Sequence, residues 1–252
     1  MDDWCKQAGH GVRFEWGPVG ADRLAAEVAC LVIVDVLSFT TSVTVAVEAG
    51  TRVHPYRWRD ESAAAFARQV NAELAVGRRA ATSASPWSLS PAALRGAPFT
   101  PRLVLPSPNG SAIASAAGDA TVVAASLRNA AAVSRWLARK GYGSAERPVA
   151  VIASGERWPD GSLRPSLEDL LGAGAVIAGL KGQRCGGTLS PEAAAAAGAF
   201  LSTPDVGAAV SAGASGRELA DAGFAEDVAI ATELDGSDVV PVLSAGAFGA
   251  AG

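Results

Sequence analysis

An acidic side chain lies near the end of the most apolar segment of this 252-residue chain. Asp35 stands between Val34 and Val36, within a run of β-branched and aliphatic residues. Removing such a carboxylate from water is costly unless a metal ion, an arginine or several N–H groups hold it. The structural alternative is an aspartate that caps the helix expected next. We favour the functional interpretation, because ligands of parallel α/β sheets bind at the carboxyl ends of the strands.

Three consecutive hydroxyl side chains follow Asp35 a few residues later. Thr40, Thr41 and Ser42 stand where a helix should begin. Their hydroxyl groups could donate hydrogen bonds to a phosphoryl oxygen or to a metal-bound water. They could equally be ordinary residues of a first helical turn, and the spacing leaves both interpretations open. We therefore keep all three as candidate substrate-binding residues.

Two further polar segments follow strands expected later in the chain. Asn109 and Gly110 stand where a helix opens, and the glycine lets the backbone approach an anion closely, although this pair is also a common turn. Ser126, Arg128 and Asn129 occupy the equivalent place after the next strand. Arg128 could bind a phosphate or sulfonate through two parallel hydrogen bonds, or be a surface arginine. All five residues are candidates for substrate binding.

The stretch from residue 154 to residue 169 joins a glycine- and arginine-bearing loop to a helix start, and it is the most suggestive in the chain. Ser166 and Asp169 have the spacing of a capping box, and acidic residues favour the positive end of a helix dipole. The spacing therefore favours a structural role for Asp169 and leaves Glu168 undecided. The functional alternative is that one of these two carboxylates binds Mg²⁺.

Other metal-binding or nucleophilic side chains are few. Two histidines, His10 and His54, are too few for a typical zinc site or a histidine-rich two-metal site. The cysteines, Cys5, Cys30 and Cys185, form no Cys-x-x-Cys pair, and none is followed by the arginine of a cysteine-phosphatase loop. We interpret all three cysteines as packing residues. Any catalytic metal should therefore be bound by oxygen atoms.

An alternation of strands and helices must position these residues, and it predicts a three-layer α/β/α fold with a largely parallel sheet. Continuous apolar runs, typical of strands covered on both faces, mark the main strands. These runs are residues 31–37, 102–105, 121–124 and 149–153. Residues 52–56 form a weaker strand candidate, followed by a helix over residues 61–74. Residues 238–243 form a late strand, which Pro241 places at an edge of the sheet.

Two segments carry little chemistry of their own. Residues 82–101 are rich in serine and proline, which predicts either a long loop or a lid. Residues 191–200 are rich in alanine, which predicts a packed structural helix. At this length and composition, residues 1–252 are expected to form a single α/β domain.

Composition limits the classes of partner. A formal charge of −4 gives no basic excess for neutralising nucleic-acid phosphates, although small anions can still bind locally. The strongest apolar run, residues 28–37, contains Asp35 and is well short of the roughly 20 apolar residues that span a bilayer. The start of the chain lacks a secretory-signal pattern, and the unpaired cysteines suit a reducing compartment, so we expect a cytoplasmic protein. A homodimer is the default expectation.

Taken in order, these motifs resemble the 2-phosphosulfolactate phosphatase family, which includes the enzyme of coenzyme M biosynthesis. The resemblance covers most of the chain and rests on five blocks. They are residues 34–37 with Thr40-Thr41, Asn109-Gly110, Ser126 with Asn129, residues 166–169 with Ala173-Gly174, and residues 234–243. The resemblance implies a Mg²⁺-dependent hydrolase on an α/β/α layered fold that removes phosphate from a substrate like (R)-2-phospho-3-sulfolactate.

The chain departs from the family's pattern at charged positions. Ser38 stands where an arginine usually follows Asp-Val-Leu, and Ala112 replaces the arginine of Asn-Gly-Thr-Arg. The family's Gly-Gly-Glu-Arg segment has its nearest match at residues 76–79, without the glutamate. Four arginines could compensate for the lost contacts with an anion. They are Arg78, Arg128, Arg157 and Arg164.

These observations lead to a hypothesis about the chemistry. Asp35 and Glu168 are the candidate catalytic residues, and together with Asp169 they are the candidate ligands of Mg²⁺. The expected substrate is a small anionic phosphate ester, with N–H groups at helix starts stabilising charge on the phosphoryl oxygens. The alternative is a catalytically impaired family member that binds a small anionic metabolite, which the missing arginines favour.

Overall fold

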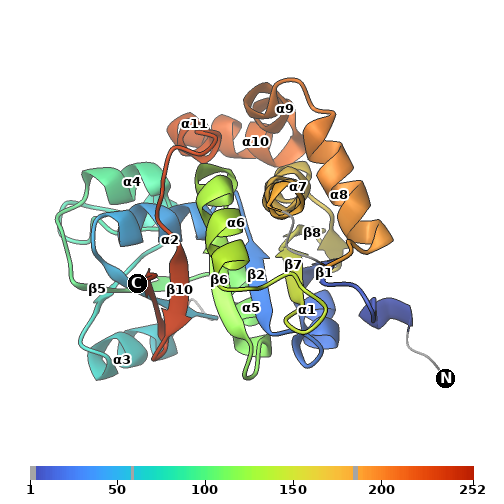
Figure 1. Ribbon diagram of the computed structural model, residues 1–252. Helices are drawn as coiled ribbons and strands as arrows, with labels where there is room; N and C mark the ends of the chain where they lie inside the picture. The colour runs from blue at the N-terminus through green and yellow to red at the C-terminus, as the bar shows by residue number, and fades with distance from the viewer. Residues whose placement is uncertain (1–3, 58–59, 184–186) are drawn as a thin grey trace.

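A nine-stranded sheet occupies the centre of the computed structural model, which describes residues 4–57, 60–183 and 187–252 (Figure 1). The strands lie in the order β1-β7-β2-β6-β10-β11-β3-β5-β4. Their bounds are β1 Val12–Trp16, β2 Cys30–Val34, β3 Arg52–Tyr56, β4 Glu73–Leu74, β5 Arg102–Pro106, β6 Thr121–Ala125, β7 Val149–Ala153, β10 Pro241–Ser244 and β11 Ala247–Ala250. A separate hairpin pairs β8, Glu156–Arg157, with β9, Leu163–Arg164.

The sheet consists of two parallel parts joined by an antiparallel hairpin. Strands β1, β7, β2 and β6 are parallel neighbours, as are β3, β5 and β4. The hairpin β10–β11 pairs antiparallel with β6 on one side and with β3 on the other. The prediction of a late strand is confirmed, but its placement at a sheet edge is wrong. Pro241 is tolerated inside the sheet because it is the first residue of β10, and β10 pairs with β6 at Val242.

Helices connect the strands and flank the sheet. Their bounds are α1 Gly17–Ala25, α2 Phe39–Glu48, α3 Glu61–Gln69, α4 Pro91–Gly96, α5 Gly110–Ala116, α6 Ala130–Arg139, α7 Leu167–Gly182, α8 Pro191–Leu201, α9 Val206–Ala212, α10 Ala214–Leu219 and α11 Ala225–Ala231. Short 3-10 turns are η1 Trp4–Lys6, η2 Arg78–Ala80 and η3 Leu127–Asn129, and the π-helical turn η4, Ala220–Phe224, joins α10 to α11. A largely parallel sheet flanked by helices confirms the α/β/α fold class.

Two helices differ from the sequence-based expectation in extent. The helix predicted over residues 61–74 ends at Gln69, because Asn71 adopts a left-handed conformation (φ 50°) before the short strand β4. Residues 82–101 are not wholly a loop, because they include helix α4. The predicted alanine-rich helix is confirmed as α8, which packs against α7.

Two apolar clusters cover the two faces of the sheet, because alternate side chains of each buried strand point to opposite faces. Val32 and Val34 of β2 pack in the cluster that contains residues of α6, α7 and α8. Leu31 and Ile33 of the same strand pack in the cluster that contains residues of α1, α2 and α5. Strand β2 is fully buried, which explains its continuous apolar sequence.

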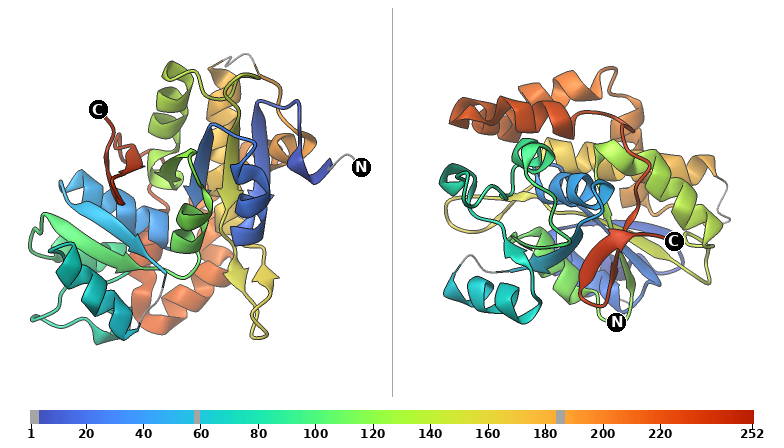
Figure 2. Two further views of the ribbon diagram at one scale, coloured as in Figure 1. Left: turned by 90° about the horizontal axis from the view of Figure 1, so that it is seen from below. Right: turned by 90° about the vertical axis from the view of Figure 1, so that its left-hand side faces the viewer.

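Helices α9 to α11 form a further group outside the sheet, drawn in orange and red in Figures 1 and 2. Helix α9 of this group contacts α7, and helix α11 contacts α4, so the group connects these two helices. Within the described ranges, no single helix is long and apolar enough to cross a membrane. The bent pair of α8 and α9 passes that test by length and composition only when the two are combined.

The cysteines differ in their surroundings. Cys30 is buried in β2, which confirms its predicted packing role. Cys5 is exposed in η1, so the packing prediction for this residue is wrong. Cys185 lies outside the described residues.

Candidate active site

The loop after β2 presents Asp35 at the carboxyl end of the sheet. The hydroxyl of Thr40 accepts a hydrogen bond from the N–H of Asp35 at 3.0 Å and donates one to its carbonyl oxygen at 2.8 Å. Oδ1 of Asp35 accepts from the N–H of Phe39 at 3.1 Å, which is the capping contact of the structural alternative. Oδ2 lies 3.5 Å from the hydroxyl of Ser154, which follows β7. Asp35 therefore caps α2 with one oxygen and faces the end of β7 with the other.

Asp169 joins the loop after β2, the loop after β7 and the start of α7. Its Oδ1 accepts from the N–H of Val36 at 2.7 Å. Its Oδ2 accepts from the N–H of Gly155 at 2.8 Å and from the hydroxyl of Ser166 at 2.9 Å. This carboxylate is buried, and each of its oxygens accepts at least one hydrogen bond, which gives Asp169 a positioning role.

The structural role of Asp169 differs in form from the predicted capping box. Ser166 precedes α7 without a hydrogen bond from its side chain to the helix backbone. Its hydroxyl instead donates a hydrogen bond to the carboxylate of Asp169, which also accepts hydrogen bonds from the loops that follow β2 and β7. The two residues are paired as the spacing predicts, but they connect strand ends rather than cap the helix.

Glu168 and Glu156 complete a group of carboxylates around Asp35. Asp35, Glu156, Glu168 and Asp169 are called the acidic group below. Glu168, in the first turn of α7, is only 2% exposed, and within the described part of the chain no protein donor is hydrogen-bonded to its carboxylate. Glu156 begins β8, directly after the Ser154-Gly155 turn. Glu156 is not among the residues predicted from the sequence, although its position just past a buried strand is a usable signal.

Burial and neighbouring negative charges raise the pKa values of three carboxylates in this group. Burial raises the pKa of Asp35 to about 6. For Glu156, burial and then the nearby charges of Asp35 and Glu168 raise the pKa to about 7. The same causes, burial first, raise the pKa of Asp169 well above its ordinary value. A group of acids whose pKa values are raised together, next to a cavity, is typical of a functional site.

A cavity of about 410 Å³ lies beside the acidic group. The lining includes Ser154 and Glu156, together with residues of the junction between β1 and α1 and of the β8–β9 hairpin. Asn109 also lines it, and its Oδ1 accepts a hydrogen bond from Nε of Arg157 at 3.1 Å. Its Nδ2 donates to the carbonyl oxygen of Gly155 at 3.2 Å. The structure therefore brings Asn109 and Arg157 next to the carboxylates.

Gly110 has a packing role at this place. A Cβ atom at Gly110 would collide with the aromatic ring of Phe39. The glycine therefore allows the start of α5 to lie against the start of α2. Its proposed approach to an anion stays a prediction.

The hydroxyl groups of residues 40–42 are engaged with the backbone. Thr40 exchanges hydrogen bonds with the backbone of Asp35, as described above. Thr41 donates to the carbonyl oxygen of Val36, and Ser42 donates to that of Leu89, each at 2.8 Å. All three hydroxyl residues are fully buried. These contacts agree with the structural alternative, in which the three residues shape the loop after β2, and their binding of a substrate stays a prediction.

Two side chains of the segment after β6 are engaged within the protein. Asn129 accepts from the N–H of Ser126 at 2.8 Å and donates to the carbonyl oxygens of Ala124 and Val239 at 3.3 and 3.0 Å. Arg128 is buried, with its guanidinium paired to the carboxylates of Glu48 and Glu233. These contacts favour a structural role for Arg128 and Asn129, and substrate binding by Ser126, Arg128 and Asn129 stays a prediction. They also exclude the surface-arginine alternative, because Arg128 is only 1% exposed.

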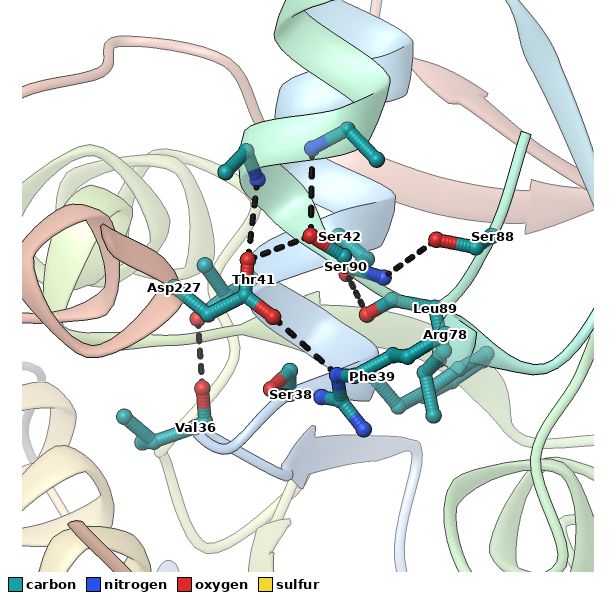
Figure 3. Close-up of polar contacts among 12 residues, drawn as sticks. Val36, Ser38, Phe39, Thr41, Ser42, Arg78, Ser88, Leu89, Ser90 and Asp227 are labelled. Carbon is teal, nitrogen blue, oxygen red and sulfur yellow. Dashed lines mark hydrogen bonds and ion pairs between the residues drawn. The ribbon is translucent and has the colours of Figure 1, made fainter. Parts of the chain in front are cut away.

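One arginine reaches the loop that carries Asp35. Figure 3 shows Arg78, from η2, beside Ser38 and Asp227. Its Nη2 donates to the hydroxyl of Ser38 at 2.5 Å, and its Nε donates to Oδ2 of Asp227, in α11, at 3.0 Å. The positive charge of Arg78 partly offsets the effect of burial on the pKa of Asp35. Helices distant in sequence thus place a cation next to the acidic group.

The carboxylates of this site fit a magnesium ion that keeps several of its water ligands. Mg²⁺ commonly takes one or two carboxylates, keeps several waters and uses phosphate oxygens of the substrate. Within the described residues, no group of three histidine, cysteine or acidic side chains is arranged to hold a metal ion. Two carboxylates are nevertheless suitable, namely Asp35 through its Oδ2 and Glu168, to which none of the described residues donates a hydrogen bond. Asp169 is a weaker candidate, because its two oxygens already accept three hydrogen bonds, and its binding of Mg²⁺ stays a prediction.

Together these features define an α/β protein with a carboxylate-rich site at the carboxyl ends of β2 and β7. Residues 20–246 match the family model for 2-phosphosulpholactate phosphatase. The chain belongs to this family, which places it among phosphatase-type hydrolases and confirms the resemblance inferred from its motifs. A comparison with curated proteins gave no match.

Proposed function

We propose that this protein is a Mg²⁺-dependent phosphatase that hydrolyses 2-phosphosulfolactate, or a similar phosphorylated 2-hydroxy acid, to the hydroxy acid and phosphate. The observation that carries the proposal is the crowding of Asp35, Glu156 and Glu168 beside a cavity at the carboxyl ends of the strands. Buried like charges are unfavourable unless a cation joins them. A site with this excess of negative charge is suited to bind a divalent cation together with an anionic ester.

Asp35 and Glu168 are the residues that would hold the metal ion. When bound, Mg²⁺ would polarise the phosphoryl group and offset its negative charge during attack by water. Asp169 supports this arrangement indirectly, because its hydrogen bonds to Val36 and Gly155 fix the loops on either side of Asp35. Such supporting residues fix the orientation of the ligands that they hold.

The cavity suits the part of the substrate that does not react. A phosphorylated 2-hydroxy acid carries a second anionic group, which a guanidinium can bind through charge-assisted hydrogen bonds. Arg157 is held at the lining by hydrogen bonds from its Nε to Asn109 and from its Nη1 to the carbonyl oxygen of Gly161. Ser154 lines the same cavity, and its hydroxyl lies 3.5 Å from Oδ2 of Asp35. The phosphoryl group would therefore lie at the acidic group, and the remainder of the substrate would lie along the hairpin.

Phosphate release from racemic 2-phospho-3-sulfolactate tests the proposal, with added Mg²⁺ and with EDTA. We expect release by the wild-type protein only with Mg²⁺. In Asp35→Asn and Glu168→Gln the rate should fall by more than the about 100-fold that loss of a supporting residue costs. Asp22→Asn, an exposed change in α1, is the matched control and should retain activity.

Two results would contradict the proposal in different ways. Full activity in Asp35→Asn would exclude the assigned site. No release from this substrate or from other phosphorylated 2-hydroxy acids, combined with binding of the substrate, would instead support the anion-binding alternative. The replacement of charged family residues by Ser38 and Ala112 is the observation that favours that alternative.

A further inference from the structure

We propose that Arg78 binds the phosphoryl group of the substrate and that Asp227, in α11, is the positioning residue that aims it. The inference rests on the proposed function, because it names a further residue of the same site. Arg78 lies in η2 and Asp227 lies 149 residues later in the chain, so their pairing exists only in the folded protein.

The guanidinium of Arg78 is held on one side and available on the other. Guanidinium groups carry five N–H donors in a rigid plane. Nε donates to Asp227, and one N–H of Nη2 donates to the hydroxyl of Ser38. Within the described residues, Nη1 forms no hydrogen bond to the protein. Nη1 and the second N–H of Nη2 can therefore bind two oxygens of one phosphoryl group, as arginine commonly does.

Asp227 is built as a fixed anchor. Its side chain is only 1% exposed. Oδ1 accepts hydrogen bonds from the hydroxyl of Ser90 at 2.5 Å and from the N–H of Ala92 at 3.2 Å, while Oδ2 accepts from Arg78. The Ser90 hydroxyl also accepts from the N–H of Ala93 and so caps α4. These contacts fix the carboxylate between α4 and α11, and they leave it little freedom to follow a moving arginine.

The ligand of this arginine is expected at the acidic group. Ser38, which Arg78 contacts, directly precedes α2 in the loop that begins with Asp35. The side chain of Arg78 remains 19% exposed, in contrast to the buried Asp227, so solvent and ligands can reach it. Phe224 lies against the guanidinium, 5.8 Å from the ring centre, and restricts its motion further. A cation at this place can neutralise the charge of a phosphoryl group that the carboxylates alone would repel.

Inorganic phosphate is the probe that tests this inference, titrated calorimetrically into the full-length protein with Mg²⁺. We expect Arg78→Ala to weaken phosphate binding about tenfold or more, because a charge-assisted pair of hydrogen bonds is lost. Arg78→Lys keeps the charge but not the planar fork, so its affinity should be intermediate. KM for the ester should rise in parallel. Arg135→Ala, which removes an exposed pair with Asp238, is the control and should bind phosphate normally.

The variant Asp227→Asn distinguishes a positioning effect on Arg78 from an effect of the net charge of the site. Removal of a carboxylate makes the site more positive, so a pure charge effect would tighten phosphate binding. Loss of positioning would weaken binding although Arg78 is still present, and this is the result we expect. Tighter or unchanged binding in folded Asp227→Asn, checked by thermal melting, would overturn the positioning role.

The outcomes also separate this inference from the proposed function. Arg78-dependent phosphate binding without any hydrolysis would retain the anion site and reject the phosphatase. Hydrolysis by the wild-type protein with unchanged phosphate affinity and KM in Arg78→Ala and Arg78→Lys would reject the anion site and retain the phosphatase. Absence of phosphate binding by the wild-type protein would overturn the inference directly.

Discussion

Two groups of charged side chains in this protein are organised in opposite ways. In the acidic group, burial and then neighbouring negative charges raise the pKa values of Asp35, Glu156 and Asp169. In the second group, called the Arg128 network below, positive and negative side chains alternate. Arg128 contacts Glu48 and Glu233, and Glu233 also contacts Arg95. The acidic group gathers charges of one sign, whereas the positive and negative charges of the Arg128 network balance each other.

This difference in charge balance distinguishes a ligand-binding site from a structural ion-pair network. A self-neutralised network needs no charged ligand, because its ion pairs are already formed within the chain. Crowded carboxylates beside a cavity are costly in the absence of a cation, and such a cost is commonly found at functional sites. Arg128 is therefore a poor candidate for substrate binding in spite of its charge. Asp35 and Glu168 are good candidates because their charges are not balanced within the acidic group.

Asp169→Asn should have the largest combined effect, because this residue supports the acidic group from within. An asparagine would turn an N–H₂ group toward the N–H of Val36 or Gly155 and leave buried donors unpaired. Each unpaired buried donor costs about 1–3 kcal/mol. We expect a loss of stability of this order in urea unfolding, with kcat/KM reduced by about 10–100-fold.

Ser166→Ala is the control for this change, because it removes one donor to Asp169 and leaves the two backbone N–H contacts in place. Its effects on stability and on kcat/KM should both be smaller. Wild-type stability in Asp169→Asn would show that the carboxylate does not join the two loops as described.

Arg128→Met should have a smaller effect, confined to stability. The change removes charge-assisted contacts to Glu48 and Glu233 but leaves both carboxylates partly exposed to water, with side chains 42% and 39% exposed. We expect the free energy of unfolding to fall by about 1–3 kcal/mol, and Tm by about 2–4 °C for each kcal/mol. KM and kcat should stay at the wild-type values. A raised KM in the folded variant would break the comparison, because Arg128 would then act on the substrate.

The sequence predicted the strands and the positions after them better than it predicted side-chain partners. The apolar run of β2 and the loop residue Asp35 follow from local pattern, and both are where the pattern places them. Asp169 contacts Val36 across 133 residues, and no local pattern contains that pairing. Arg128 could be assigned to a phosphate or to the surface only because Glu48 and Glu233 were not known to be its neighbours.

The hairpin β10–β11 shows the same limit at the level of topology. Pro241 indicates an edge strand when only local hydrogen bonding is considered. The pairing of β10 with β6 and of β11 with β3 is instead fixed by contacts between segments more than a hundred residues apart in the printed sequence. The same holds for Arg78 and Asp227, whose types predict an ion pair but whose separation conceals it.

The smallest expected effect is a pH dependence of stability that only the acidic group should produce. Burial raises the folded-state pKa of Asp35 from an ordinary 3.8 to about 6, and that of Glu156 from 4.5 to about 7. The folded protein then binds protons more tightly than the unfolded chain, so the stabilisation is complete at low pH and is lost as pH rises through these values. Without Mg²⁺, Tm should therefore fall by a few degrees between about pH 5 and about pH 8.

Three measurements sharpen this expectation. Asp35→Asn should flatten the decline, because the variant has no charge to bury at that position. Added Mg²⁺ should raise Tm most at the high end of the range, where the carboxylates are ionised and a cation offsets their repulsion. Arg128→Met should lower Tm by a similar amount across the range, since its partners lie outside the acidic group. A Tm that is independent of pH in the metal-free wild-type protein would show that the carboxylates are not crowded, and the contrast between the two groups would then lose its physical basis.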